Sequence, residues 1–219
     1  MSKNDSLNSN LSYKFLVLGD QMVGKTSILE RYINNTFKGQ YLLTIGMDKR
    51  FKRLEINNHD VDIFITDTAG QERFRSLTKM FYKGADGILL GFSLTDKKSL
   101  ESTDYWVNQI NENCSKEKPI SLILFGNKCD DKDNIQVTPE EINGIKTKHN
   151  LIYYETSAKD NINIKEIFEH LTKETIIKRK DLKALGLKQN TSINDIIIKE
   201  KENQKLEIVK IKPKKKKFC

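Results

Sequence analysis

Residues Gly19–Thr26 read Gly-Asp-Gln-Met-Val-Gly-Lys-Thr, and this stretch decides the fold. It fits the pattern G-x-x-x-x-G-K-[ST], the phosphate-binding P-loop, in which backbone N–H groups and a helix N-terminus surround one anion. The apolar residues 13–18 predict a strand before the loop, and residues 26–33 predict a helix after it. The candidate nucleotide contacts of this region are Gly19, Asp20, Gln21, Met22, Val23, Gly24, Lys25, Thr26 and Ser27.

Two side chains of this loop have the chemistry that a nucleoside triphosphate needs. Lys25 supplies a cation for the β- and γ-phosphates, and the hydroxyl of Thr26 can ligate Mg²⁺. An ordinary glycine turn in front of a helix is the alternative interpretation of the same eight residues. The strand and the helix that flank the loop favour the P-loop.

The remainder of the chain alternates between predicted strands and helices. Strands are predicted at residues 51–56, 61–66, 87–92, 120–125 and 152–156, and helices after Thr138 and around Ile164–Leu171. This order predicts an α/β P-loop NTPase fold with a mainly parallel, six-stranded sheet flanked by helices. We expect a flexible N-terminus over residues 1–11, a nucleotide-binding domain over 12–178, and a disordered, basic C-terminal tail over 179–219.

The charge of the chain is concentrated at its end. Residues 178–219 carry 14 basic and 5 acidic residues, whereas the preceding residues carry 24 and 25, within a total of +8. A nucleic-acid-binding face would normally lie on the folded domain, so this distribution favours an anionic membrane as partner and no nucleic acid. The sequence shows no signal peptide, no membrane span and no zinc or disulfide spacing, and we expect a cytoplasmic protein.

A second motif, Asp67-Thr68-Ala69-Gly70-Gln71, follows the strand predicted at 61–66. Asp67 can hold Mg²⁺ through a water molecule, and Gly70 can offer its N–H to the γ-phosphate. Gln71 can orient the attacking water, which makes it the candidate catalytic residue. Taken alone, the motif also fits a simple turn after a strand.

A third motif, Asn127-Lys128-Cys129-Asp130, follows the strand predicted at 120–125. The carboxylate of Asp130 can accept two hydrogen bonds from guanine, and adenine lacks that pair of donors. Asn127 would brace the neighbouring loops, and the stem of Lys128 would cover the base. The loop after the last strand supplies further candidates for contact with the base, Ser157, Ala158 and Lys159.

With these motifs in place, the chain resembles the Rab-type small GTPases of the Ras superfamily over nearly all of residues 12–178. The motifs that carry the resemblance are Gly19–Thr26, Thr44–Asp48, Asp67–Leu77, Lys83–Gly87, Asn127–Asp130 and Glu155–Lys159. The resemblance implies the small G-protein fold, and GTP and GDP as substrate and product with Mg²⁺ as cofactor. It also implies a metal set of Thr26, Thr44 and, through water, Asp67. Phe37 would pack against guanine, and Tyr41 would lie over the phosphates.

The resemblance also implies how the protein meets its partners. Two switches, near Gln40–Asp48 and Gly70–Tyr82, would contact an exchange factor, an activating protein and effectors in vesicle traffic. Aromatic residues expected at positions 49 and 66 are replaced by Lys49 and Thr66, so the partner surface is altered. Partners therefore do not transfer from familiar relatives.

The terminal cysteine, Cys219, follows the lysine run 214–217 and suggests a prenyl anchor supported by basic residues. This arrangement implies a peripheral protein on the cytosolic face of a membrane. An unmodified thiol and a nuclear-import patch are the alternatives for this tail. For the whole chain, the alternatives are a nucleotide-bound scaffold with negligible hydrolysis and a nuclear GTPase of the same superfamily.

Overall fold

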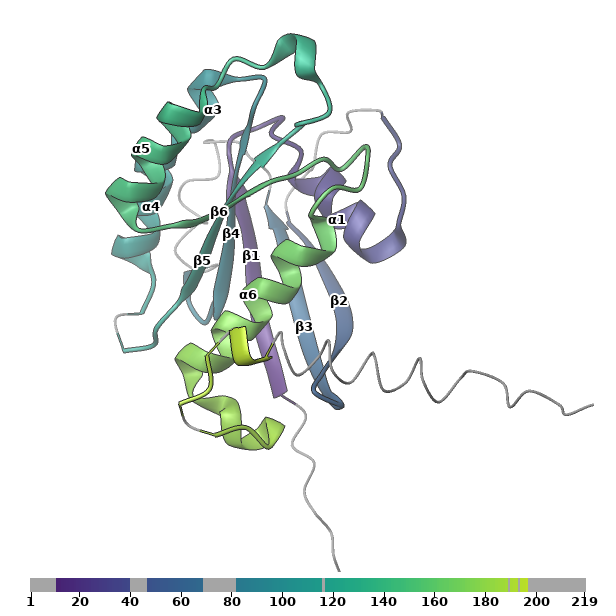
Figure 1. The fold of residues 1–219 in the computed structure, drawn as a ribbon, viewed down its shortest axis with the longest axis vertical. Coiled ribbons are helices and arrows are strands. Elements are labelled where there is room, and N and C mark those ends of the chain that lie inside the picture. The colour runs from purple at the N-terminus through teal and green to yellow at the C-terminus, as the bar shows by residue number, and fades with distance from the viewer. Residues whose placement is uncertain are drawn as a thin grey trace, which may run out of the picture.

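The structure is a computed structural model that describes residues 11–39, 47–68, 82–115, 117–188, 190–192 and 194–196. At its centre is a six-stranded sheet with the order β2-β3-β1-β4-β5-β6 (Figure 1). The strands are β1 (Leu11–Gly19), β2 (Met47–Ile56), β3 (His59–Thr68), β4 (Gly87–Ser93), β5 (Ser121–Asn127) and β6 (Ile152–Glu155). Only β2 runs antiparallel to its neighbour, so the predicted α/β fold with a mainly parallel sheet is confirmed.

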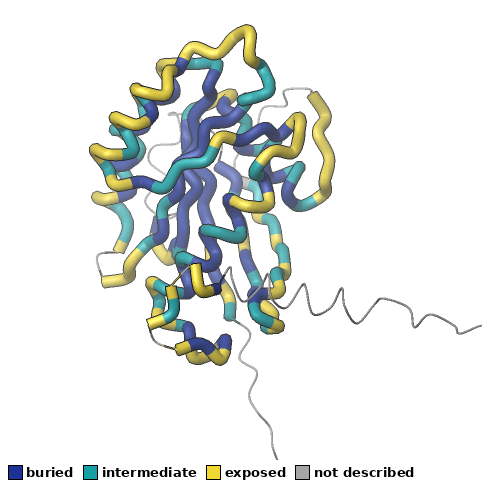
Figure 2. Tube along the Cα trace, viewed as in Figure 1, coloured by how far each residue is buried: buried dark blue, intermediate teal, exposed yellow. Residues whose placement is uncertain are grey.

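Helices cover both faces of this sheet (Figure 1). They are α1 (Lys25–Asn34), α3 (Lys97–Glu101), α4 (Thr103–Asn113), α5 (Pro139–His149) and α6 (Ile164–Arg179), with short 3₁₀ helices η2 (Lys132–Asn134) and η3 (Asp181–Leu185). Buried residues of α1 and α6 form one core with Phe15 and Ile63, and residues of α4 and α5 form a second core with Leu16. The central strands are therefore buried on both faces (Figure 2), as parallel strands normally are.

The edge of the sheet is a hairpin of β2 and β3. Asn57 and Asn58 join the two strands with positive φ angles of 51° and 62°. Both values suit a two-residue hairpin turn, in which asparagine tolerates the left-handed conformation. The turn fixes the register, so that Phe51 lies opposite Phe64 and Arg53 lies opposite Asp62.

The chain continues to pack against the domain after α6. Arg179 forms an ion pair with Asp86, and the hydroxyl of Tyr13 donates to Asp181 at 2.7 Å. The buried apolar side chains of the following residues belong to the core formed with α6, and these are Leu182, Leu185, Leu187 and Ile196. The described part of residues 181–196, called the C-terminal segment below, thus differs from the separate tail expected from residue 179 onward. The lysines around it lower its mean hydropathy, but leucines one turn apart give it an apolar face.

Candidate nucleotide site

The loop between β1 and α1 has a backbone that only glycine accommodates at two points. Gly19 has a φ angle of 134°, and a Cβ there would lie 2.1 Å from the carbonyl oxygen of Gly91. Gly24 caps α1 with a φ angle of 96°, and a Cβ there would lie 2.2 Å from Nδ2 of Asn127. Gly19 is therefore required by the close approach of the β4 backbone, and Gly24 by its left-handed conformation and the adjacent Asn127 side chain. The conformation leaves the N-terminus of α1 at the carboxyl edge of the sheet, where it attracts anions.

Lys25 lies buried beneath this loop. Its Nζ donates to the carbonyl oxygens of Gly19 at 2.9 Å and of Asp20 at 2.7 Å. Burial lowers its pKa to about 8, and the nearby carboxylates of Asp67 and Asp20 only partly oppose this effect. The ammonium group is thus fixed within the loop, at the position where the sequence predicts a cation for the phosphates.

Thr26 and Asp67 meet across the sheet edge, although 41 positions separate them in the sequence. The Thr26 hydroxyl donates to Oδ2 of Asp67 at 2.6 Å. The other oxygen, Oδ1, is buried and has no hydrogen-bond partner among the described residues. Burial raises the pKa of Asp67, while the Thr26 hydrogen bond and the charge of Lys25 lower it. A buried carboxylate with one unsatisfied oxygen beside a hydroxyl fits a hard divalent cation such as Mg²⁺.

Asn127 connects three loops of the site. Its Nδ2 donates to the carbonyl oxygen of Val23 at 2.8 Å, and its Oδ1 accepts from the N–H of Ala158 at 3.3 Å. The side chain is buried, so these bonds are protected from water. The bracing role predicted for Asn127 is consistent with these contacts, because one amide ties the P-loop to the loop after β6.

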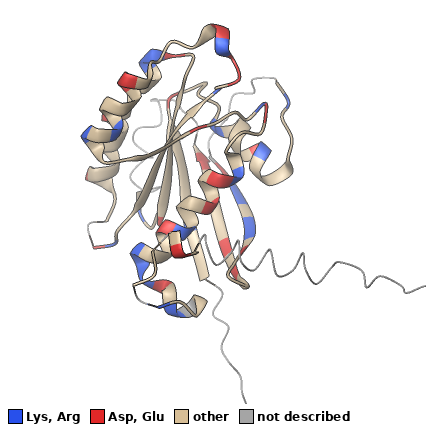
Figure 3. Cartoon of the chain, viewed as in Figure 1, with Lys and Arg blue, Asp and Glu red and all other residues tan. Residues whose placement is uncertain are grey.

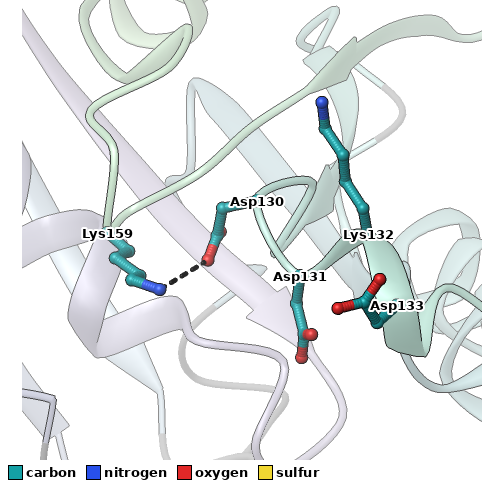
Figure 4. Close-up of a pocket in the computed structure, with 5 residues that line it drawn as sticks. All are labelled: Asp130, Asp131, Lys132, Asp133 and Lys159. Atoms are coloured by element: carbon teal, nitrogen blue, oxygen red, sulfur yellow. Dashed lines mark ion pairs between the residues drawn. The ribbon is translucent and has the colours of Figure 1, made fainter.

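Asp130 is one of the residues that line a neighbouring pocket (Figure 4). Its Oδ1 accepts a hydrogen bond from Oγ of Ser157 at 2.6 Å, and its Oδ2 is 3.8 Å from Nζ of Lys159. The pocket is lined by Asp130, Asp131, Lys132, Asp133 and Lys159. The two motifs that the sequence assigns to the base are therefore adjacent in space. Lys128 begins this turn with a φ angle of 68°.

Two further residues contribute to the site without having been predicted from the sequence. Arg31 of α1 donates through Nε to the carbonyl oxygen of Ala158 at 2.8 Å and through Nη2 to that of Lys159 at 3.0 Å. Trp106 of α4 donates through Nε1 to Oδ1 of Asp20 at 2.7 Å. A lone arginine on a helix and a lone tryptophan carry no motif, so only the tertiary structure reveals these contacts.

The remaining predicted residues fall into two groups. Ser27 lies in the first turn of α1, while Gln21, Met22 and Phe37 are exposed beside the site. The predictions for Tyr41, Thr44, Gly70, Gln71 and Cys219 fall outside the described residues. Within the described ranges, no group of three His, Cys, Asp or Glu side chains could hold a metal ion, and no helix is long and apolar enough to cross a bilayer.

Comparisons with known proteins agree with this geometry. The model of the Ras family matches residues 14–177. The chain is 35% identical to the Ras-related protein Rab-13 of Rattus norvegicus over 191 residues. The aligned part makes up 87% of this chain and 93% of the relative. It is 37% identical to Rab-10 of Diplobatis ommata over 78% of this chain and 87% of the relative. With Rab-8A of Gallus gallus the identity is 38%, over 74% and 77% of the two chains.

Proposed function

Because the chain belongs to the Ras family and is a small GTPase of the Rab type, we propose that it acts as a GTP/GDP switch in vesicle and membrane traffic through the site described above. The observation that carries the proposal is the junction of the P-loop with Thr26, Asp67 and Asp130 at one edge of the sheet. As a GTPase, the protein converts GTP to GDP and phosphate.

Phosphate binding in this proposal is the work of the loop and its lysine. The N–H groups at the start of α1 and the ammonium of Lys25 bind the β- and γ-phosphates. Thr26 and, through water, Asp67 would hold Mg²⁺, with Thr44 as a further ligand. When bound, the ion neutralises negative charge on the phosphates. Burial of Lys25 lowers the local dielectric around its ammonium group, which strengthens its attraction to the phosphates.

Hydrolysis in this proposal depends on residues of the second switch. Gln71 orients the attacking water, and Gly70 offers its N–H to the γ-phosphate. The sequence has no arginine between Phe37 and Thr44, so that segment supplies no arginine to stabilise the developing charge. We therefore expect slow turnover until an activating protein supplies such an arginine, which increases the rate by roughly 10³–10⁵.

Single-turnover hydrolysis of bound GTP tests this function. The Gln71→Leu variant keeps the volume of the side chain but cannot orient water, so it should bind GTP normally and hydrolyse it more slowly. Thr26→Asn is the complementary variant, because loss of the metal ligand should weaken GTP more than GDP. Equal hydrolysis rates for wild type and Gln71→Leu would favour the alternative, a nucleotide-bound scaffold.

Membrane attachment is the second part of the proposal. Rab-type relatives associate with membranes through lipid anchors, and the basic tail offers Cys219 for prenylation. Peripheral binding to a cytosolic membrane face would then combine one lipid with the lysines at 214–217. Cys219→Ser should release the protein from membranes, and mass spectrometry of protein from its native cells should show the added lipid. A terminal cysteine without lipid, in protein that still sediments with membranes, would contradict this anchor.

A further inference from the structure

Two aromatic side chains stand exposed on the hairpin of β2 and β3. Phe51 and Phe64 are 50% and 44% exposed, and they lie directly opposite each other in the antiparallel register. Their ring centroids are 5.3 Å apart with an interplanar angle of 49°. We call these two residues the phenyl pair. The two rings form one continuous apolar surface at the edge of the sheet.

The phenyl pair is unusual among the exposed apolar residues that the structure describes. The other large exposed side chains are Met22, Phe37, Tyr105, Ile135 and Ile162. In the described ranges, no other ring contact joins two exposed aromatic side chains. Isolated exposed apolar residues are normal, whereas a contiguous apolar patch marks an interaction site. The pair also lies two residues along the strands from Lys49 and Thr66, which pair with each other on the same face, where aromatic residues were expected and are missing.

Charges around the phenyl pair favour an acidic partner at one end. Strand β2 carries four basic residues (Figure 3), but Arg50 and Lys52 belong to the opposite face, where they bond to Glu30 and to the carbonyl oxygen of Tyr32. Arg53 is neutralised by Asp62 through hydrogen bonds of 2.6 and 2.9 Å. Lys49, which is exposed, therefore sets the charge beside the pair at the end nearer the nucleotide site.

We propose that the phenyl pair is a docking surface for an amphipathic protein helix that carries a carboxylate at the border of its apolar face. The apolar face would cover Phe51 and Phe64, and the carboxylate would lie over Lys49. A helix suits this surface because side chains at i, i+3 and i+4 form a narrow stripe that fits across two strands. Burying both rings supplies the affinity, and the charge pair sets the orientation.

The location of the pair connects docking to the nucleotide. Strand β2 begins at Met47, at the end of the first expected switch, and β3 ends at Thr68, just before the second. Relatives of the Rab type meet regulators and effectors through these switches, so the phenyl pair extends that surface. Tighter docking to the GTP-bound form than to the GDP-bound form would follow only if the proposed switch function holds. The docking surface itself is argued from the hairpin of β2 and β3 and does not need that function.

Three synthetic helical peptides provide the test. The first has an apolar stripe bordered by glutamates, the second has the same stripe bordered by lysines, and the third has serines in place of the stripe. Each is titrated into the ¹⁵N-labelled full-length protein loaded with GDP or with a non-hydrolysable GTP analogue. The glutamate peptide should bind most tightly and shift the amide signals of β2 and β3. Phe51→Ser/Phe64→Ser should weaken it by roughly 30-fold, a loss typical of an interface hot spot.

Matched control variants distinguish the effect of the two rings and of Lys49 from the effect of changing any exposed side chain. Ile135→Ser removes a similarly exposed side chain from the loop after η2, and it should leave binding unchanged. Lys49→Glu should reverse the preference, so that the lysine peptide binds more tightly than the glutamate peptide. Lys118→Glu, a charge change in an exposed loop, should preserve the wild-type preference. Nucleotide affinity and hydrolysis of every variant are measured in parallel, so that failure of the switch function is distinguished from failure of docking.

Several outcomes would overturn the proposal. Peptide binding that survives loss of both rings would show that the hairpin is not the binding surface. Binding that ignores the sign of the peptide charge would overturn the proposed contact between Lys49 and a carboxylate of the partner helix. Sedimentation that reveals a dimer dependent on the two rings would assign the surface to a second copy of the chain. Binding to phosphatidylserine vesicles that decreases in the double Phe variant would assign it to the membrane.

Discussion

The ammonium group of Lys25 is held by two carbonyl oxygens of its own loop, and burial lowers its pKa to about 8. Only the protonated form attracts phosphates, so we predict that GDP affinity declines as the pH rises above about 8, approaching tenfold per pH unit. Competition binding at constant ionic strength between pH 7 and 9.5 measures this. Lys25→Gln should bind weakly at every pH, and a flat wild-type profile would contradict the prediction.

The same lysine has an opposite effect on the nucleotide-free protein. Its pKa in the folded protein is about 8, whereas the ordinary value is 10.5. Between about pH 8 and pH 10.5 the unfolded chain therefore binds more protons at this group than the folded chain does. The free energy of unfolding contributed by this group therefore rises with pH across that window. The charge on Lys25 is therefore expected to make nucleotide binding and the stability of the nucleotide-free protein respond to pH in opposite directions.

Asp130 tests the choice of base. The amide in Asp130→Asn presents a donor where the carboxylate accepts, so we predict a shift of preference from guanosine toward xanthosine nucleotides. Asp133→Asn is the matched control, because Asp133 lines the same pocket and should leave the preference unchanged. Competition between GDP and XDP measures both variants. Unchanged GDP preference in Asp130→Asn would remove Asp130 from base recognition.

At the scale of elements, α1 supports the base loop through Arg31. Its two hydrogen bonds to the Ala158 and Lys159 carbonyl oxygens cross from one element to another. We predict that Arg31→Ala accelerates GDP release by about tenfold, since a charged hydrogen bond contributes on the order of 1.5 kcal/mol or more. Release of a fluorescent GDP analogue measures the rate. Arg31→Lys should recover part of the effect, and equal rates for all three proteins would exclude this support.

The sequence predicted the strands better than the helices. Strands β1, β4 and β5 are short apolar runs with few alternatives, and the capping box of Thr138 and Glu141 begins α5 as predicted. The helical region over 97–113 was not predicted. Helix α3 has only five residues, and Ser102 at the start of α4 makes no side-chain cap bond, so this region lacks the proline and capping box that mark the start of α5.

Local motifs led to the candidate site residues, whereas contacts that depend on packing were missed. Loops such as Gly19–Thr26 and Asn127–Asp130 carry their chemistry in consecutive residues, so a single sequence suffices to find them. Trp106 reaches Asp20 across 86 positions, and no local pattern indicates that contact. The burial of the C-terminal segment was missed for a related reason, because the lysines beside its leucines conceal their shared apolar face.

At the scale of the whole molecule, the C-terminal segment adds stability to the domain. Leu182 is buried in the core with α6, so we predict that Leu182→Ala lowers the free energy of unfolding by about 2–5 kcal/mol. Thermal unfolding of the nucleotide-bound protein should shift downward by roughly 2–4 °C per kcal/mol. Lys183→Ala changes an exposed neighbour in the same turn, and it should remain close to wild type. Matching melting temperatures for the two variants would show that the segment does not contribute.

The hydrogen bond from Tyr13 to Asp181 also shows which end of the sheet the C-terminal segment packs against. Tyr13 lies near the amino end of β1, whereas the nucleotide loops follow the carboxyl ends of the strands, so the C-terminal segment and the site occupy opposite poles (Figure 1). A lipid on Cys219, as proposed above, would therefore attach the domain to the membrane from the pole remote from the nucleotide. A domain held to a bilayer in this way would point its switches toward the cytosol, within reach of proteins arriving from solution.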